Sequence, residues 1–296
     1  MSFQMGKISA RVWSILEEDT RSCFPIAYLL AGDDKEYIAS VISVLLIDTG
    51  CGCGDIYAFV KQQSIIKEKK IIVVNTHNHP EQTGGNFLFS TTGKLGMAHM
   101  VEDLCASGRD KYYTQLRNSN WHWEINTYKV TRWLSDGDTI LLGNSAEAHN
   151  VVKVIWTPGH TPDSLVLWYA SDNRLFIGDL FYRFDDIMLT YEYTSIKEYE
   201  GSLRRILSFI NNQPHPKQIR YSASKNDTDV ECLPAFKHFH RFLLAVLAGT
   251  HVGSPLRIDE AEGWRFETRD KAMRIVLGRD IVKRLNQARE KAQQYR

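Results

Sequence analysis

Two histidines separated by one residue stand out in the segment VVNTHNHPEQTGG, residues 73–85. In an extended segment, residues i and i+2 point to the same side, so the imidazoles of His77 and His79 could bind one metal ion. Such pairs also occur by chance on exposed loops, where both rings are merely solvated. The pair therefore indicates a metal site without defining one.

Two further polar side chains follow predicted strands. His160 stands in the turn TPGH after an apolar run, and Asp179 follows the segment RLFIG. Catalytic zinc usually takes three protein ligands and keeps a position for water, so His77, His79 and His160 alone would make a competent site. Asp179 is then a fourth ligand or a link to a second ion.

A carboxylate at another strand end is suited to support these ligands. Asp48 follows the apolar stretch that ends at residue 47. Ligating histidines usually donate their second ring N–H to an acceptor, which fixes the tautomer. We expect Asp48 to play this part for one of the histidines.

The elements that must position these side chains alternate between strands and helices. Apolar runs and turn signals predict the following strands: residues 10–16, 25–30, 38–47, 70–74, 139–142, 151–156, 164–169, 174–177 and 218–221. Amphipathic patterns predict the following helices: residues 55–63, an interrupted stretch at 101–128, 195–211, 234–248 and a charged C-terminal helix after a hairpin at 264–276. The four strands between residues 139 and 177 are separated by turn signals and form an antiparallel meander.

Composition narrows the class of protein. The chain has 296 residues, 43% apolar and 24% charged, which is ordinary for a globular protein. Lys plus Arg number 36 against 35 for Asp plus Glu, so the net charge of +1 provides no overall field for nucleic acid. There is no run of about 18 apolar residues and no N-terminal signal pattern. Five cysteines, an odd number, suit reduced thiols, so we expect a cytoplasmic protein with a small-molecule partner.

The order of four motifs, IDTG, THNHPEQTGG, TPGHTPDS and FIGD, closely resembles the metallo-β-lactamase superfamily. The resemblance covers roughly residues 11–227. It implies an α/β fold, a four-layered αβ/βα sandwich with two mixed β-sheets between outer helices and the metal centre along one edge. We expect a metallo-β-lactamase-like domain over residues 1–230, with residues 231–296 packed on it. Within the superfamily, the acyl-coenzyme A thioesterase and lactonase-like branch is nearest in appearance.

The sequence departs from the family signature at the second metal site. The family's His-x-His-x-Asp-His becomes HNHPEQ, so Glu81 replaces the shorter acid and the amide of Gln82 replaces an imidazole. The first site is intact. The resemblance thus implies one well-formed metal site and one altered site.

The other half of the second site has also changed. The family's last histidine would follow a later strand, but the chain there reads YSASKND, residues 221–227. A second ion would keep Asp179, Glu81 and an oxygen from Asn226 or Asp227, a poorer set than His plus carboxylate. Lys225 could instead provide a positive charge there. We predict one tightly bound Zn²⁺, with a remodelled two-metal site as the alternative.

The expected activity is metal-assisted hydrolysis of a small ester, thioester or lactone, with a lactam possible. Zinc lowers the pKa of bound water to about 7, so hydroxide can attack a carbonyl at neutral pH. Glu81 and Asp179 are the carboxylates suited to orient that water and move its proton. Lys225 or Tyr221 could donate to the oxyanion. The alternative is a catalytically inactive member that binds a metabolite or another protein.

Other notable residues have structural explanations. Cys51 and Cys53 could bind metal or form a disulfide. They occupy variable loop positions, however, and we favour the interpretation that they are loop filler, that is, loop residues without a chemical role. His238 and His240 point to different faces of a predicted helix and are expected to be structural. The tryptophans at positions 121, 123 and 133 fit a core and an apolar substrate cleft equally well.

Overall fold

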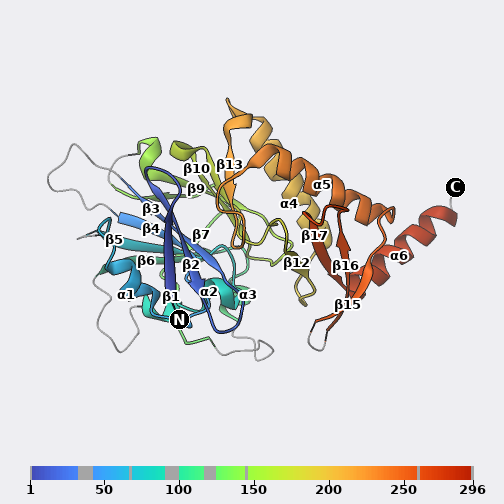
Figure 1. Ribbon diagram of the computed structural model, residues 1–296, viewed down its shortest axis with the longest axis horizontal. Helices are drawn as coiled ribbons and strands as arrows, with labels where there is room; N and C mark the ends of the chain where they lie inside the picture. Colours follow the sequence, from blue (N-terminus) through green and yellow to red (C-terminus); the bar gives the residue numbers. More distant parts are fainter. Residues whose placement is uncertain are drawn as a thin grey trace. The chain divides into compact units, whose positions relative to one another are not determined.

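The computed structural model describes residues 2–32, 43–66, 69–90, 100–116, 125–143, 146–258 and 261–294 (Figure 1). The chain forms two compact units. The first contains residues 1–156 and 163–178, and the second contains residues 157–162 and 179–296. The predicted boundary near residue 230 stays a prediction.

Seven described strands of the first unit form one sheet in sequence order. They are β1 (Ser2–Lys7), β2 (Val12–Glu18), β3 (Ile26–Ala31), β4 (Ser43–Ile47), β5 (Lys70–Val74), β6 (Val101–Ser107) and β7 (Arg132–Leu134). Pairing is antiparallel from β1 to β4 and parallel from β4 to β7. The carboxyl ends of β4 and β5 therefore lie side by side, which brings the segments after Ile47 and Val74 to one edge.

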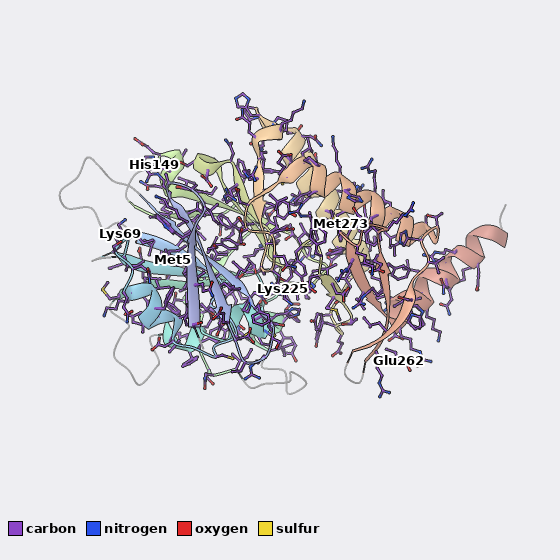
Figure 2. The ribbon with its side chains drawn as sticks, viewed as in Figure 1. Met5, Lys69, His149, Lys225, Glu262 and Met273 are labelled. Atoms are coloured by element: carbon purple, nitrogen blue, oxygen red, sulfur yellow. The ribbon has the colours of Figure 1, made fainter. Side chains whose placement is uncertain are left out.

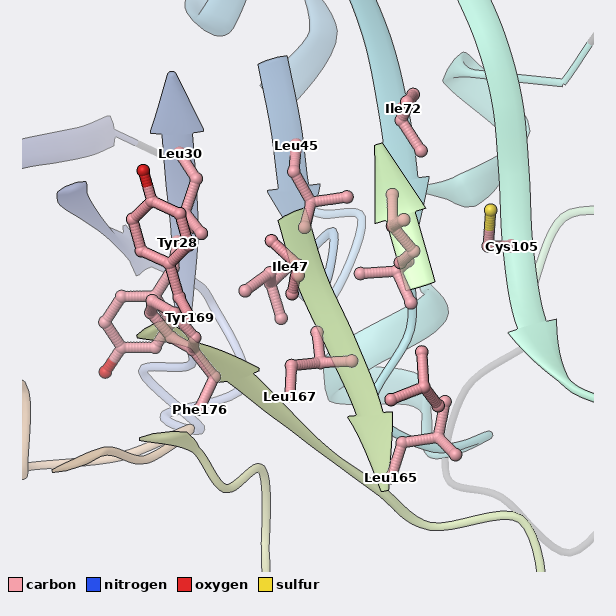
Figure 3. Close-up of a cluster of buried hydrophobic side chains, with 14 of the residues drawn as sticks. Tyr28, Leu30, Leu45, Ile47, Ile72, Cys105, Leu165, Leu167, Tyr169 and Phe176 are labelled. Carbon is pink, nitrogen blue, oxygen red and sulfur yellow. The ribbon is translucent and has the colours of Figure 1, made fainter. Parts of the chain in front are cut away.

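Four more strands of the first unit form the predicted antiparallel meander. They are β8 (Thr139–Leu141), β9 (Val151–Trp156), β10 (Leu165–Tyr169) and β11 (Arg174–Phe176). Apolar side chains of both sets of strands meet in one buried cluster (Figure 3). The rings of Tyr28 and Phe176, for example, lie 5.2 Å apart between centroids. This face-to-face packing holds the sheets together through burial of apolar surface.

A second apolar cluster covers the other face of the seven-stranded sheet. Helix α1 (Ile56–Lys61) contributes Ile56, Tyr57 and Val60, which pack with strand residues such as Val73. The helix begins where the sequence predicts, because the Asp55 carboxylate accepts the N–H of Ala58 at 2.8 Å. The other short helices of this unit are α2 (Pro80–Thr83), α3 (Lys111–Gln115) and the 3₁₀ turns η1 (Asn86–Leu88), η3 (Ala148–Asn150) and η4 (Ala170–Asp172).

The second unit contains the longer helices. They are α4 (Ile196–Asn211), α5 (Cys232–Ala248) and α6 (Arg279–Gln294), with the 3₁₀ turn η5 (Pro216–Gln218). Its strands are β12 (Asp186–Leu189), β13 (Arg220–Ser222), β14 (Val230–Glu231), β15 (Ser254–Ile258), β16 (Ala261–Glu267) and β17 (Arg274–Gly278). Four of them form a sheet in the order β12-β17-β16-β15. Helices α4 and α5 are joined through aromatic packing and by His240, whose Nε2 lies 3.0 Å from Oε1 of Glu200, so His240 is structural as predicted.

The predicted interrupted helix at residues 101–128 is wrong. Residues Val101–Ser107 form β6, which pairs in parallel with β5, and only Lys111–Gln115 are helical in the described part of this stretch. The run from Leu104 to Ser107 is buried inside the sheet, and pairing with β5 outweighs its helical pattern. Trp121 and Trp123 lie outside the described residues. Within the described chain, none of the helices combines the length and apolarity needed to cross a membrane.

Candidate metal centre

In the first unit, the loop after β5 holds His77 and His79 close together. Both side chains are 2% exposed, and their ring centroids lie 4.5 Å apart at an interplanar angle of 71°. The start of the loop is fixed by a mutual amide contact. Asn75 Nδ2 donates to Asn86 Oδ1 at 3.1 Å, and Asn86 Nδ2 donates to Asn75 Oδ1 at 2.8 Å. The predicted histidine pair is therefore buried and held at the end of a strand.

His77 is oriented through a threonine that the sequence analysis did not single out. The Asp48 carboxylate accepts the Thr76 N–H at 2.7 Å and the Thr76 hydroxyl at 2.9 Å. The Thr76 oxygen lies 3.1 Å from Nδ1 of His77. Because the single hydroxyl proton goes to the carboxylate, the Thr76 oxygen must accept from Nδ1–H of His77. This assigns the proton to Nδ1 and leaves the Nε2 lone pair for a ligand.

Asp48 is thus linked to His77 through Thr76, and its part in a metal site stays a prediction. Asp48 is 3% exposed and has a left-handed φ of 63°, which is unusual for a residue with a side chain. Its N–H donates to Val74 at 2.9 Å, so the adjacent ends of β4 and β5 hold it in place. The useful signal in the sequence was the threonine directly before the first histidine.

A proline ends the extended loop and starts a helix after His79. His79 is the N-cap residue of α2 and Pro80 is its first residue, where a missing N–H costs nothing. Glu81 and Gln82 therefore lie on a helical turn and do not continue the extended spacing of the histidines. Glu81 is half-buried and Gln82 is 1% exposed. The side-chain oxygen of Gln82 has no hydrogen-bond partner among the described residues.

The glycine pair after these residues allows two loops to touch. A Cβ at Gly84 would lie 2.3 Å from the backbone carbon and oxygen of Cys51, which no real side chain permits. The segment after β4 therefore packs directly on the end of α2. This contact explains the glycine pair without any role in chemistry.

In the second unit, the turn that carries His160 is fastened to the start of α4. Ser202 Oγ donates to the Pro158 carbonyl at 2.7 Å, and the Ser195 N–H donates to the Gly159 carbonyl at 2.9 Å. Gly159 has a φ of 137°, and a Cβ there would lie 2.2 Å from the Tyr199 nitrogen. Only glycine fits, so the turn presents His160 in one orientation.

His160 faces Asp179 within the same unit. Nε2 of His160 lies 3.7 Å from Oδ2 of Asp179, and the side chains are 3% and 11% exposed. Burial lowers the pKa of His160, an effect opposed by Asp179 and reinforced by the positive charge of Lys225. The ring is therefore neutral at pH 7, which is the form that binds a metal ion. Tyr191 covers it, with ring centroids 5.7 Å apart and nearly perpendicular.

Residues 39–227, well over half of the chain, match the family model of the metallo-beta-lactamase superfamily. The chain belongs to the metallo-beta-lactamase superfamily. Among curated proteins, the hydroxyacylglutathione hydrolase of Nitrosococcus oceani is 32% identical over 110 residues. That of Rhodospirillum rubrum is 28% identical over 113 residues. Each alignment covers 36% of this chain and 32% of the relative, so only about a third of each relative is spanned.

Solved structures of the superfamily share the fold. A metallo-beta-lactamase from Pontibacter korlensis has a TM-score of 0.55 at 19% identity, over 82% of this chain and 99% of that one. A family protein from Thermus thermophilus has a TM-score of 0.58 at 14% identity, over 84% and 85%. A third protein, in a di-iron-bound form, has a TM-score of 0.53 at 19% identity, over 72% and 93%. The predicted α/β sandwich of the metallo-β-lactamase type is confirmed.

In the second unit, two residues that could have bound a second ion, Asp227 and Asn226, form hydrogen bonds to other protein groups. Asp227 is 2% exposed and accepts from the N–H and Nε of Arg183 at 2.9 and 3.0 Å. It also accepts from the Tyr221 hydroxyl, so Tyr221 is not available as the oxyanion donor that the sequence suggested. Asn226 donates its side-chain amide to the Arg183 carbonyl at 3.0 Å. These bonds build a structural turn at the position where the family carries its last histidine.

Lys225 belongs to the same turn and is labelled in Figure 2. The Asp227 N–H donates back to the Lys225 carbonyl at 2.5 Å, and the Lys225 ammonium lies 5.8 Å from the centroid of the Tyr182 ring. The positive charge of Lys225 adds to burial in lowering the pKa of His160. The turn therefore brings a cation toward the His160 and Asp179 pair.

Proposed function

We propose that this chain is a metal-dependent hydrolase of small-molecule thioesters or esters, with His77, His79, His160 and Asp179 holding one ion. The donor set carries the proposal, because these are three imidazoles and a carboxylate, the ligands that suit catalytic zinc. The residues fit the ion on two further grounds. The imidazoles are buried, and Thr76 leaves Nε2 of His77 able to accept a metal.

The chain's own residues have distinct parts in the proposed reaction. When bound, the ion supplies Lewis-acid chemistry, which polarises a carbonyl and acidifies water. Thr76 and Asp48 keep His77 in one tautomer and orientation. Glu81, half-buried on the first turn of α2, is the proposed base that takes a proton from the attacking water. Lys225 provides a positive charge that would stabilise the developing oxyanion.

A single tightly bound ion is favoured over two. Gln82 offers an amide where the family has an imidazole, and Asp227 is held by Arg183 and Tyr221. Lys225 also places a positive charge near His160, which disfavours a second cation. We propose zinc for the ion. Iron is the alternative metal to test, since one structural neighbour is in a di-iron-bound form.

The substrate class follows from the leaving group and the relatives. Hydroxyacylglutathione, in the names of both curated relatives, is a thioester. Thioesters and esters have better leaving groups than amides. Their hydrolysis therefore needs the least stabilisation from a site that offers one ion and one lysine. Lactones are the next substrates to test, and lactams the last.

The test combines metal content with hydrolysis on the same samples. The dialysed protein is expected to carry about one zinc per chain and to hydrolyse members of a panel of acyl-glutathione, acyl-coenzyme A, aryl ester, lactone and lactam substrates. His160→Ala should lose both metal and activity. His215→Ala, an exposed histidine of the same unit, is the matched control and should keep both. Bound zinc with no hydrolysis across the panel would favour the inactive binding protein instead.

A further inference from the structure

We infer that Asp19, Cys23 and Cys51 form a separate binding site for a thiophilic divalent cation in the first unit. Asp19 and Cys23 lie in the loop between β2 and β3, and Cys51 lies in the loop after β4. This site shares no ligand with the proposed hydrolase centre. It revises the expectation that Cys51 is loop filler.

The three ligand atoms are already close to the spacing that a tetrahedral ion requires. One carboxylate oxygen of Asp19 and the sulfurs of Cys23 and Cys51 all lie within 4.8 Å of one another. Two sulfurs that bind one zinc at about 2.3 Å are about 3.8 Å apart. Small side-chain rotations would therefore close the site.

Asp19 is held in position for this role. Its Oδ1 accepts the N–H of Arg21 at 2.6 Å and that of Cys23 at 3.3 Å, and its Oδ2 accepts the N–H of Phe24 at 2.6 Å. A carboxylate has about four lone-pair sites, so one remains for a metal ion after these three bonds. Hydrogen-bonded carboxylates of this kind are typical of metal sites. Asp19 is 8% exposed, so little water competes for it.

Glu17 holds the opposite loop. Its carboxylate accepts the N–H groups of Cys51, Cys53 and Gly54 at 2.6, 3.0 and 3.3 Å, and it is 2% exposed. The Cys51 backbone is thereby fixed beside Cys23. Glu17 also adds a second buried carboxylate near the thiols, and this negative surrounding favours a bound cation.

A cation fits this cluster better than a disulfide between Cys23 and Cys51. Disulfide formation needs a thiolate as nucleophile, and carboxylates beside a thiol disfavour its thiolate form. A divalent cation instead binds the two sulfurs with release of both thiol protons to solvent, and it also uses the carboxylate. Two thiolates and one carboxylate select a soft or borderline ion such as zinc over calcium or magnesium. Water completes the fourth position.

Cys53 provides a matched control, because it lies two residues away and outside the group. It is half-buried, and its sulfur accepts a long contact from the Thr20 hydroxyl at 3.8 Å. A bound ion would join the β2–β3 loop to the loop that packs on Gly84 at the end of α2. The expected role is therefore to stiffen the segment beside the histidine loop.

The test uses the full chain, reduced and stripped of metal, titrated with Co²⁺. The parent is expected to develop the near-ultraviolet absorption of a cobalt–thiolate bond, with an amplitude that corresponds to one thiolate-bound Co²⁺ per chain and that is lost when Zn²⁺ displaces it. Cys23→Ser and Cys51→Ser should each abolish it, whereas Cys53→Ser should keep it. Asp19→Asn should weaken Co²⁺ binding at least about tenfold. His160→Ala should retain the band, so failure of the hydrolase proposal would not remove this signal.

Several outcomes would overturn the proposal of a cation site at Asp19, Cys23 and Cys51. A parent protein without the cobalt–thiolate band would do so, and this measurement does not depend on any variant folding. A cobalt–thiolate band that survives in Cys23→Ser would also contradict the proposed site. So would air-oxidised protein in which Cys23 and Cys51 are linked by a disulfide and bind no metal. In the metal-loaded parent, two thiols should react with an alkylating reagent at least about tenfold more slowly than in the stripped protein. Equal reaction rates would contradict the proposal.

Discussion

Replacement of Thr76 by valine tests whether the histidine site depends on its orientation by Asp48. Valine keeps the shape of threonine and removes only the hydroxyl. The hydroxyl links the Asp48 carboxylate, at 2.9 Å, to Nδ1 of His77, at 3.1 Å. The Thr76 N–H still reaches Asp48 at 2.7 Å, so the loop itself should survive. The variant therefore separates orientation of His77 from its presence.

The magnitude follows from the two bonds lost. A hydrogen bond to a charged group contributes about 1.5–3 kcal/mol, and Asp48 keeps the bond from the Thr76 N–H, so we expect a loss of about 2 kcal/mol in the free energy of unfolding. Loss of a residue that orients a metal-bound histidine typically weakens metal binding by about 10–100-fold. We expect Thr76→Val to weaken zinc binding in that range.

Thr83→Val is the matched control. Its hydroxyl is also buried, and it donates its proton to the backbone carbonyl of His79 at 2.9 Å rather than to an imidazole. Equilibrium unfolding in urea measures stability, and competition with a chromogenic chelator measures zinc affinity. Both variants should lose stability, and only Thr76→Val should lose zinc affinity. Equal zinc affinities in Thr76→Val and the parent would refute the orienting role of Thr76.

Three other variants test different parts of the structure. Glu81→Gln should keep its zinc but lower turnover by roughly 10²-fold, the usual effect of removing a positioned base; parental turnover would exclude Glu81 from the chemistry. Burial raises the pKa of Glu17 in the folded chain, so a proton binds the folded state more tightly than the unfolded one. In stripped, reduced protein, the parent's free energy of unfolding should therefore fall relative to that of Glu17→Gln as pH rises from about 4 through the folded pKa; a relative rise in a urea series would contradict this. Asp227→Asn should cost about 2 kcal/mol of stability, because it weakens buried bonds from Arg183 and Tyr221. The exposed Asp229→Asn should change stability by less than about 0.5 kcal/mol in the same urea assay.

Local pattern in the sequence determined the elements that carry the proposed ligands. The strands at residues 70–74 and 151–156 were predicted with the boundaries that the structure has, because each is an apolar run that ends at a polar turn. The start of α4 at Ser195 follows from a side-chain cap to Glu198, which is also local. The family follows from the order of four short motifs. All of these signals lie within a few neighbouring residues.

Tertiary structure alone decided the contacts between distant segments. Strand β6 forms because its buried half pairs with β5, although its own pattern is helical. The support of His77 by Asp48 runs through Thr76, and Cys51 lies close to Glu17 of β2 and to Cys23 of the loop that follows β2. No periodicity of a single segment encodes such pairs, because they arise only when packing of the sheets brings the ends of separate strands together. The sequence thus predicts the proposed ligands, whereas their hydrogen-bond partners depend on which strand ends the folded sheet places side by side.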